Sequence, residues 1–247
     1  MPAVLVHGVP EDAHLWDDVV AALGRDDVVC PNLPGFTTPR PPGFPATKEA
    51  YAGWLVEEVE RLGEPVDLVG HDWGGGFAMR LVSTRPDLVR SWVVDTGALG
   101  HPDFEWHDFA KLWQTPGEGE AFFEAMAGLS AQDRAATLSA SGVPADAALA
   151  LSERTGPHMK EMGGCILDLY RSAVKVNEDW GPDFRDIRPP GMIVIPSDDP
   201  FLNGEQARQT AGRVGAKVVE LQGLGHWWVL QDPARAAAVL EEFWASV

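Results

Sequence analysis

Short runs of apolar, mostly β-branched residues recur along the chain and constrain its fold more than any other feature. The runs are AVLV (3–6), DVVC (27–30), VDLV (66–69), SWVVD (91–95), GMIVI (191–195) and AKVVEL (216–221), and Gly or Pro follows each of them closely. They lack the strict apolar–polar alternation of a strand that is exposed on one face. Such runs are typical of strands that are buried on both faces of a parallel sheet.

Helical patterns lie between several of these runs. The segment KEAYAGWLVEEVERLG (48–63) places apolar side chains on one stripe and charged side chains opposite. GGFAMRLVSTRPD (75–87) fills the next gap, and DPARAAAVLEEFW (232–244) begins with Asp232 as a candidate N-cap and Pro233 at the first helical position. This alternation predicts an α/β fold with a mostly parallel central sheet and helices on both faces.

The interval between SWVVD and GMIVI interrupts this alternation. It is rich in helix formers, aromatic residues and Gly or Pro, and it contains no clear buried strand. We expect this insertion to form a helical cap, or lid, over the carboxyl edge of the sheet, where open α/β folds bind ligands. The predicted division is a core domain of residues 1–98 and 185–247 and a cap of residues 99–184.

The composition of the chain limits its partners. Its 247 residues carry a formal net charge of −18, which repels nucleic acid and anionic membranes. The segment MPAVLVHG (1–8) lacks the basic region and long apolar core of a signal peptide, and no run approaches the roughly 20 apolar residues that span a bilayer. We therefore expect a cytoplasmic protein that binds neither nucleic acid nor a membrane, whereas the charge says nothing specific about a small neutral substrate.

The cysteines and histidines do not indicate a metal or cofactor site. Cys30 and Cys165 are far apart in the sequence, and the histidines show no HExxH spacing. Cys30 follows an apolar run, so its thiol is expected to be buried. We predict that the protein uses neither a metal nor a cofactor.

The segment VDLVGHDWGGGFAMRL (66–81) has the spacing of a strand–turn–helix elbow that presents a nucleophile. Gly70, Gly74 and Gly75 allow the sharp turn that such an elbow needs. The residue at its tip is Asp72, whose negative charge would be stabilised by the positive end of the following helix. The chain contains no Gly-x-Ser-x-Gly motif, so Asp72 is the candidate nucleophile.

Two later motifs provide the partners that such a nucleophile needs. PSDDPF places Asp198 and Asp199 directly after a predicted strand, and GLGHWW places His226 in a glycine-rich loop. The order nucleophile, acid, histidine is that of hydrolases built around this elbow. The identity of the acid is left open between Asp199, Asp198 and Asp95, the last residue of SWVVD.

Five motifs in this order, HGVP, LPGF, GHDWGG, PSDDPF and GLGHWW, resemble the α/β-hydrolase superfamily. The match is best to the branch with an aspartate nucleophile, which includes epoxide hydrolases and haloalkane dehalogenases, and it covers roughly residues 3–100 and 190–247. In the register of the family motif, Asp199 fits the acid better than Asp198. The family's opening hairpin is expected to be absent, because the chain begins at the strand before HGVP, and a homodimer would then cover the exposed sheet edge.

The resemblance implies a reaction in two steps. Asp72 would attack an sp³ carbon and form an ester, and His226 would then deprotonate the water that hydrolyses this ester. The backbone N–H groups of Val9 and Trp73 would form the oxyanion hole. An aspartyl ester can be hydrolysed, whereas a serine alkylated at carbon would give a stable ether.

Tyr170, in LDLYRSA, favours an epoxide as the substrate. It matches the cap tyrosine that epoxide hydrolases use as an acid, and an epoxide needs a proton donor because it opens to an alkoxide. Haloalkane dehalogenases commonly have Asn after HG, where this chain has Val9. The resemblance thus implies an epoxide hydrolase that acts on a small apolar epoxide, with water as its co-substrate. The alternatives are a haloalkane dehalogenase that uses the same Asp72 and a non-catalytic ligand-binding protein of the same fold.

Further residues are expected to contact the substrate. Epoxide hydrolases usually have two proton donors in the cap, often both tyrosines, whereas Tyr51 in this chain lies on a predicted core helix. The candidate second donors are histidines, first His107 and then His101 and His158. The candidate walls of an apolar pocket are tryptophans, namely Trp73, Trp106 and Trp227.

Overall fold

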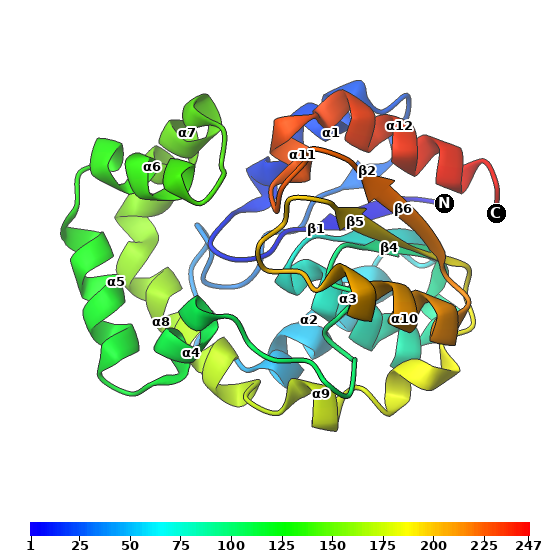
Figure 1. Cartoon of the computed structure of the whole chain (residues 1–247), viewed down its shortest axis with the longest axis horizontal. Helices are drawn as coiled ribbons and strands as arrows, with labels where there is room; N and C mark the ends of the chain where they lie inside the picture. The colour runs from blue at the N-terminus through cyan, green and yellow to red at the C-terminus, as the bar shows by residue number, and fades with distance from the viewer.

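The computed structural model describes residues 1–247, leaving aside the side chain of Asp186. Its six strands form one sheet in the order β2-β1-β3-β4-β5-β6, and every pair of neighbouring strands is parallel (Figure 1). The strands are β1 (Ala3–Val6), β2 (Val28–Val29), β3 (Val66–Gly70), β4 (Val89–Val94), β5 (Gly191–Pro196) and β6 (Lys217–Leu221). The predicted α/β fold with a mostly parallel sheet is confirmed.

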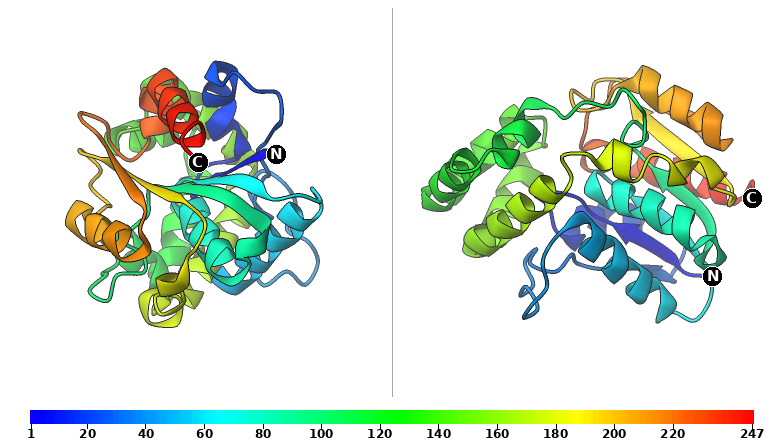
Figure 2. Two further views of the ribbon diagram at one scale, coloured as in Figure 1. Left: turned by 90° about the vertical axis from the view of Figure 1, so that its right-hand side faces the viewer. Right: turned by 90° about the horizontal axis from the view of Figure 1, so that it is seen from below.

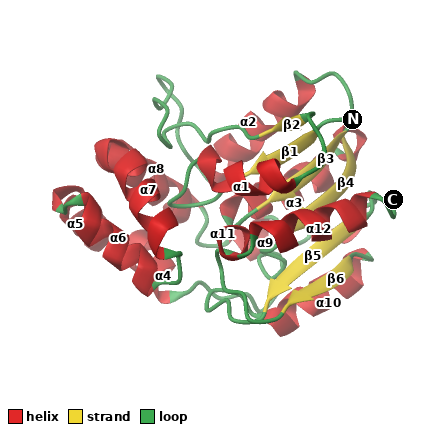
Figure 3. Cartoon of the chain, turned by 90° about the horizontal axis from the view of Figure 1, so that it is seen from above, coloured by secondary structure: helices red, strands yellow, loops and turns green.

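Helices cover both faces of this sheet, as the alternation of elements predicted. One face packs against α1 (Asp17–Ala22), α11 (Trp228–Gln231) and α12 (Pro233–Trp244), and the other against α2 (Lys48–Glu60), α3 (Trp73–Thr84) and α10 (Gly204–Val214) (Figures 1 and 3). Successive residues of β1 point to opposite faces of the sheet. Leu5 therefore packs in the hydrophobic core beneath α1, α11 and α12, whereas Val4 and Val6 pack in the core beneath α2, α3 and α10. The predicted N-cap is confirmed, since the Asp232 side chain accepts from the N–H of Arg235.

The insertion between β4 and β5 is helical throughout its described secondary structure. It contains α4 (Asp108–Gln114), α5 (Glu118–Gly128), α6 (Ala131–Ala140), α7 (Ala145–Thr155), α8 (Met159–Ser172) and the short α9 (Val176–Asp179). Helices α4 to α8, called the cap helices below, lie together at one side of the sheet (Figure 2). The exact division into core and cap domains stays a prediction.

The two edge strands differ from the prediction that all runs are buried on both faces. Lys217, Val218 and Glu220 of β6 are exposed, and so is Val29 in β2. Cys30 directly after β2 is only half-buried, so the prediction of a buried thiol was wrong. The reason is topological, because an edge strand has a neighbour on one side only, and β2 is just two residues long.

No helix among the residues that were searched is both long enough and apolar enough to span a bilayer.

Candidate active site

Asp72 lies at a sharp turn between β3 and α3, where the sequence predicted the elbow. Its backbone has φ 50° and ψ −123°, a left-handed conformation that is strained for any residue with a side chain. Two glycines make this turn possible. A Cβ atom on Gly70 would lie 2.3 Å from the carbonyl oxygen of Gly74, and one on Gly74 would lie 2.2 Å from that of Val6. The turn therefore holds the Asp72 carboxylate beyond the carboxyl end of β3.

The two carboxylate oxygens of Asp72 have different neighbours. The N–H of Val9 donates to Oδ1 at 2.9 Å, so the predicted oxyanion-hole donor contacts the carboxylate directly. Oδ2 lies 3.7 Å from Nε2 of His226, which is close enough for an ion pair but too long for a hydrogen bond. Trp73 is the first residue of α3, and the first N–H groups of a helix have no acceptor within the helix.

His226 is held by Asp199. Its Nδ1 lies 2.9 Å from Oδ2 of Asp199, whose other oxygen accepts from the N–H of Phe201 at 2.8 Å. Burial by itself lowers the pKa of His226. The hydrogen bond and charge of Asp199 outweigh burial and, with the charge of Asp72, raise this pKa to about 10. The imidazole of the free protein is therefore protonated at neutral pH.

The other two candidate acids do not contact His226. Asp198 is exposed and accepts from the hydroxyl of the adjacent Ser197 at 2.7 Å. Asp95 is buried, and its Oδ1 accepts from the backbone N–H of Asp72 at 2.9 Å. Its Oδ2 pairs with Nδ1 of His71 at 2.5 Å. Of the three carboxylates, only that of Asp199 is placed to orient His226.

The buried pair of His71 and Asp95 supports the turn that carries Asp72. Burial opposes the charge of each, but the charge and hydrogen bond of the other residue prevail, so the pKa of Asp95 is lowered and that of His71 is raised. Trp228 also donates to Asp95, at 2.7 Å from its indole nitrogen. Asp95 therefore fixes the backbone of Asp72, whereas Asp199 orients His226.

Tyr170 on α8 faces the same cavity as Asp72 and His226. It is almost fully buried, and its ring packs at centroid distances of 4.9–5.5 Å against Trp73, Trp106 and Trp113. Burial, followed by the charge of Asp72, raises the pKa of Tyr170 well above its usual value. Its phenol therefore keeps its proton at any ordinary pH.

His107 lies beside Tyr170, with its ring centroid 6.4 Å from that of the phenol. Its Nδ1 accepts from the N–H of Ala110 at 3.2 Å, which leaves the proton of the neutral ring on Nε2. Burial lowers the pKa of His107, so the ring is neutral at pH 7. His101 instead binds Gln209, at 2.8 Å, and the hydroxyl of Tyr51 donates to the carbonyl of Pro34.

Two cavities meet at Asp72. The larger has about 920 Å³ of free space, including its open mouth, and reaches from the loops after the strands to the cap helices. The smaller, of about 490 Å³, lies beside Trp73, Thr96 and Trp106. Both are lined by Asp72, His107, Phe201 and His226. Of the predicted tryptophan walls, Trp227 lines the larger cavity, whereas Trp73 and Trp106 line the smaller one.

A sequence model described as "Alpha/beta hydrolase family" matches residues 3–239. The chain belongs to the α/β hydrolase family. The solved structures similar to this hydrolase include haloalkane dehalogenase DbeA of Bradyrhizobium elkani, with a TM-score of 0.72 and 19% identity over 100% of this chain and 92% of that one. The thioesterase domain of the curacin biosynthetic pathway has a TM-score of 0.70 and 17% identity, over 97% of this chain and 91% of that one. At such identities the likeness concerns the fold.

Curated relatives of this α/β hydrolase match over shorter segments. The soluble epoxide hydrolase of Corynebacterium sp. is 35% identical over 97 residues, which are 38% of this chain and 34% of that protein. The haloalkane dehalogenase of Psychrobacter cryohalolentis is 26% identical over 118 residues, 46% of this chain and 39% of that protein. The chain thus aligns with little more than a third of the length of these relatives.

Three buried polar residues of this α/β hydrolase were not singled out from its sequence. His71 pairs with Asp95, and Arg134 on α6 lines the larger cavity. Glu11 is fully buried, and its Oε1 accepts from the indole N–H of Trp227 at 2.8 Å. Burial raises the pKa of Glu11, although the nearby charge of His71 opposes this shift. The only sequence feature that could have indicated Glu11 is the acidic pair, Glu11 and Asp12, that directly follows HGVP.

Within the part of the chain that the structure describes, no group of three or more His, Cys, Asp or Glu side chains is arranged to hold a metal ion.

Proposed function

We propose that this α/β hydrolase converts an epoxide to a vicinal diol through a covalent ester on Asp72. The observation that carries the proposal is the placement of Tyr170. Its buried phenol lines the cavity that also exposes Asp72 and His226, so a proton donor and a carboxylate nucleophile face the same space. An epoxide requires both groups at once, because its carbon is attacked while its oxygen becomes an alkoxide.

In the first step, Oδ2 of Asp72 attacks an epoxide carbon. Oδ1 is already held by the N–H of Val9, which leaves Oδ2 as the free nucleophilic oxygen. A new bond forms between Oδ2 and the carbon while the carbon–oxygen bond of the epoxide breaks. The high pKa of Tyr170 keeps the phenol protonated, and the much more basic alkoxide takes this proton. His107, with its proton on Nε2, is the proposed second donor.

In the second step, His226 acts as the base. Formation of the ester removes the negative charge of Asp72, which is one of the charges that hold the proton on His226. The imidazole then releases its proton, which replaces the one that Tyr170 has given up. The neutral ring, oriented by Asp199, can now take a proton from water.

Water then hydrolyses the ester at its carbonyl carbon. Its oxygen adds to Cγ of Asp72, and the negative charge that develops on Oδ1 is held by the N–H groups of Val9 and Trp73. The bond between Cγ and Oδ2 breaks, the leaving oxygen takes the proton that His226 removed from water, and the diol leaves with the former Oδ2 atom. The proton that remains on the new carboxyl group passes to His226, which restores the protonated imidazole. The carboxylate of Asp72 thereby gains its new oxygen from water.

The decisive experiment traps the ester with His226→Gln. This variant is incubated with terminal epoxides and with 1-haloalkanes, and its intact mass is recorded. We expect an adduct with the full mass of the epoxide, mapped to Asp72 by peptide analysis. An adduct that lacks the halogen would instead favour a haloalkane dehalogenase.

The double variant Asp72→Ala, His226→Gln serves as the control and should remain unlabelled. A single turnover of the wild type in H₂¹⁸O should place the label in Asp72 rather than in the diol. If the wild type turned over no epoxide or haloalkane and the trap stayed unlabelled, the non-catalytic alternative would be preferred.

A further inference from the structure

A buried cation lies at the cap end of the cavity that contains Asp72. Arg134 on α6 is 8% exposed and lines this cavity, as does the fully buried Ser152 on α7. The reacting groups Asp72 and His226 belong to the loops after the strands at the opposite, core side of the cavity. One continuous space therefore has a nucleophile at one end and a guanidinium at the other.

The guanidinium of Arg134 has no carboxylate partner among the described residues. Its Nη1 donates to the carbonyls of Leu129 and Met126 at 2.5 and 3.5 Å, and its Nη2 donates to that of Ser152 at 3.2 Å. These contacts tie α5 to α7 but leave the positive charge without a counter-ion. Buried charges in proteins are normally paired, because an unpaired charge loses its hydration without compensation.

Three other buried charged residues, Lys48, Asp12 and Asp67, follow that rule. Lys48 pairs with Asp179 at 2.9 Å and with Glu49, and Asp12 pairs with Arg154 at 2.9 Å. Asp67 contacts two arginines. Arg134 therefore stands apart from comparable cations in the described chain, and its missing partner calls for an explanation.

Two hydrogen-bonding atoms at this end of the cavity also lack partners. They are Nε of Arg134 and Oγ of Ser152, both of which are buried. The remaining hydroxyls in the same wall are already bonded to helix carbonyls, those of Thr137, Ser141 and Thr155. A carboxylate accepts two parallel bonds from an arginine fork and a further bond from a hydroxyl. The unpartnered Nε of Arg134 and the hydroxyl of Ser152 can each donate one hydrogen bond to such a carboxylate.

The walls between the two ends are apolar. They include the side chains of Trp113, Phe123, Met126 and Met159, all from the cap helices and their junctions. A ligand that reaches both ends must therefore carry an apolar segment between two polar groups. The formal net charge of −18 does not oppose an acid at this position, because exposed charges are screened by salt more strongly than a buried one.

We propose that Arg134 and Ser152 form a carboxylate subsite, and that the substrate is an organic acid whose apolar chain separates the carboxylate from the reacting epoxide. The epoxide end rests on the function proposed above, whereas the acid end depends only on the cap residues. The subsite thus refines the expectation of a purely apolar substrate.

The test compares an ω-epoxyalkanoic acid with its methyl ester, over a series of chain lengths. For the best-fitting length, wild-type kcat/KM should favour the acid by about tenfold or more, the range expected of a hydrogen bond to a charged group. Arg134→Met should reduce the acid-to-ester ratio to near one, mainly by raising KM for the acid. Ser152→Ala should lower the ratio less. Lys160→Met, which removes a cap charge exposed to solvent, should keep the wild-type ratio.

A second measurement separates the subsite from the reaction. Calorimetry with a saturated alkanoic acid, which has no epoxide, should show binding to the wild type and loss of that binding in Arg134→Met. If the wild type bound the saturated acid but turned over no epoxide, the subsite would be supported and the proposed function would be refuted. Equal wild-type turnover of acid and ester at every length, with no binding of the saturated acid, would overturn the subsite whether or not Arg134→Met folds.

Discussion

At the scale of single residues, the cap and the core provide complementary groups. Asp72, His226 and Asp199 come from loops that follow strands, and Tyr170 and His107 come from the cap side of the cavity. One carboxylate oxygen of Asp72 accepts from the N–H of Val9, and the protonated His226 lies near the other. This arrangement leads to two predictions that concern individual side chains.

Replacing Tyr170 with Phe should lower kcat for epoxides by roughly 10²-fold or more, the usual contribution of a general acid. The ring packing would be retained, because only the hydroxyl is removed. His107→Gln should have a smaller effect of about tenfold. Steady-state kinetics check both variants, and His101→Gln, which alters a histidine that binds Gln209 instead, is the control. Unchanged epoxide turnover in Tyr170→Phe would remove the tyrosine from the mechanism.

The raised pKa of His226 should make the stability of the protein depend on pH. The folded pKa is about 10 and the unfolded value is near 6.5, so the stabilisation is fully present below pH 6.5 and is lost as the pH rises towards 10. Within this window the native state holds the extra proton, and the free energy of unfolding should fall by up to about 1.4 kcal/mol per pH unit. Urea unfolding at several pH values checks this, and His226→Gln should lose this component of the slope.

Part of the site could be predicted from the sequence because it depends on local spacing. Asp72 in its glycine-rich turn and His226 in its loop can be recognised in short motifs, and the structure places them together. The pairing of His71 with Asp95, and the isolation of Arg134, depend on which side chains meet across the fold. No motif encodes such contacts, so they became visible only in the structure.

At the scale of elements, the elbow depends on close backbone contacts. Gly74→Ala would place a Cβ atom 2.2 Å from the carbonyl oxygen of Val6, and should cost about 1–3 kcal/mol of stability or more, together with activity. Gly53 lies within α2 with no atom near its missing Cβ, so Gly53→Ala should stabilise the protein by about 0.5–1 kcal/mol. Thermal and urea unfolding compare the two. Equal effects would show that helix propensity, rather than crowding at the elbow, dominates.

The elements that could be predicted are those with a strong apolar pattern. The run AVLV coincides with β1, and the segment 48–63 contains α2. Helix α10 was not predicted, because it buries only small or polar side chains, Ala207, Thr210 and Ala211, and so shows no apolar stripe. The exposure of β6 could not be foreseen either, since a sequence run does not reveal whether its strand lies at an edge.

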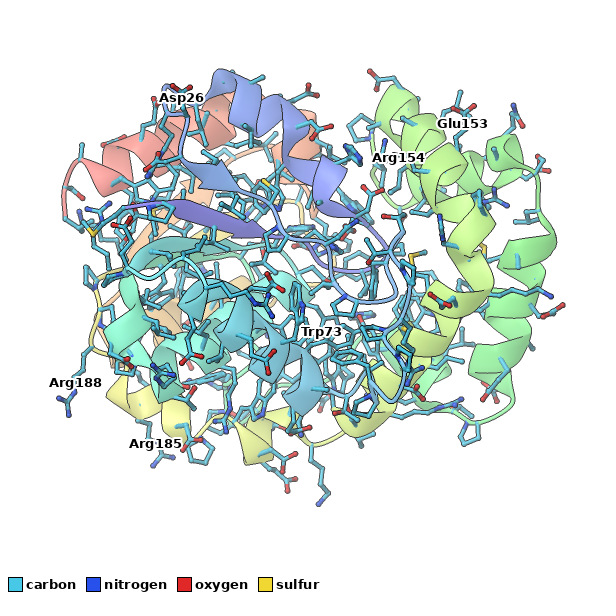
Figure 4. All side chains as sticks on the ribbon, turned by 180° about the vertical axis from the view of Figure 1, so that it is seen from behind. Asp26, Trp73, Glu153, Arg154, Arg185 and Arg188 are labelled. Carbon is cyan, nitrogen blue, oxygen red and sulfur yellow. The ribbon has the colours of Figure 1, made fainter. Side chains whose placement is uncertain are left out.

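At the scale of the whole molecule, an ion pair joins the cap helices to the core. Arg154 on α7 contacts both oxygens of the buried Asp12, at 2.9 and 3.1 Å, and Figure 4 shows Arg154 where α7 approaches the N-terminal segment. Arg154→Met leaves this carboxylate buried without its partner. The side chain of Arg154 is 34% exposed, so the loss should be moderate, about 1–2 kcal/mol.

Urea unfolding measures this loss of stability. In Arg154→Met, amide hydrogen exchange should also become faster in α7 than in α3. Lys160→Met, which breaks an exposed pair with Glu124, is the matched control and should change stability by less than about 0.5 kcal/mol. Identical stability of Arg154→Met and the control would show that the pair contributes nothing to holding the cap helices in place.

The parallel arrangement of all six strands also affects how the protein is made. No two neighbouring strands can be joined by a tight turn, and β4 ends at Val94 whereas its neighbour β5 begins only at Gly191. Such distant pairings form slowly, while α6 and α7, which are adjacent in sequence, can associate early. His226 follows the last strand of the chain. A polypeptide emerging from the ribosome therefore acquires the Asp72–His226 contact only after β6 and the loop that follows it have been synthesised.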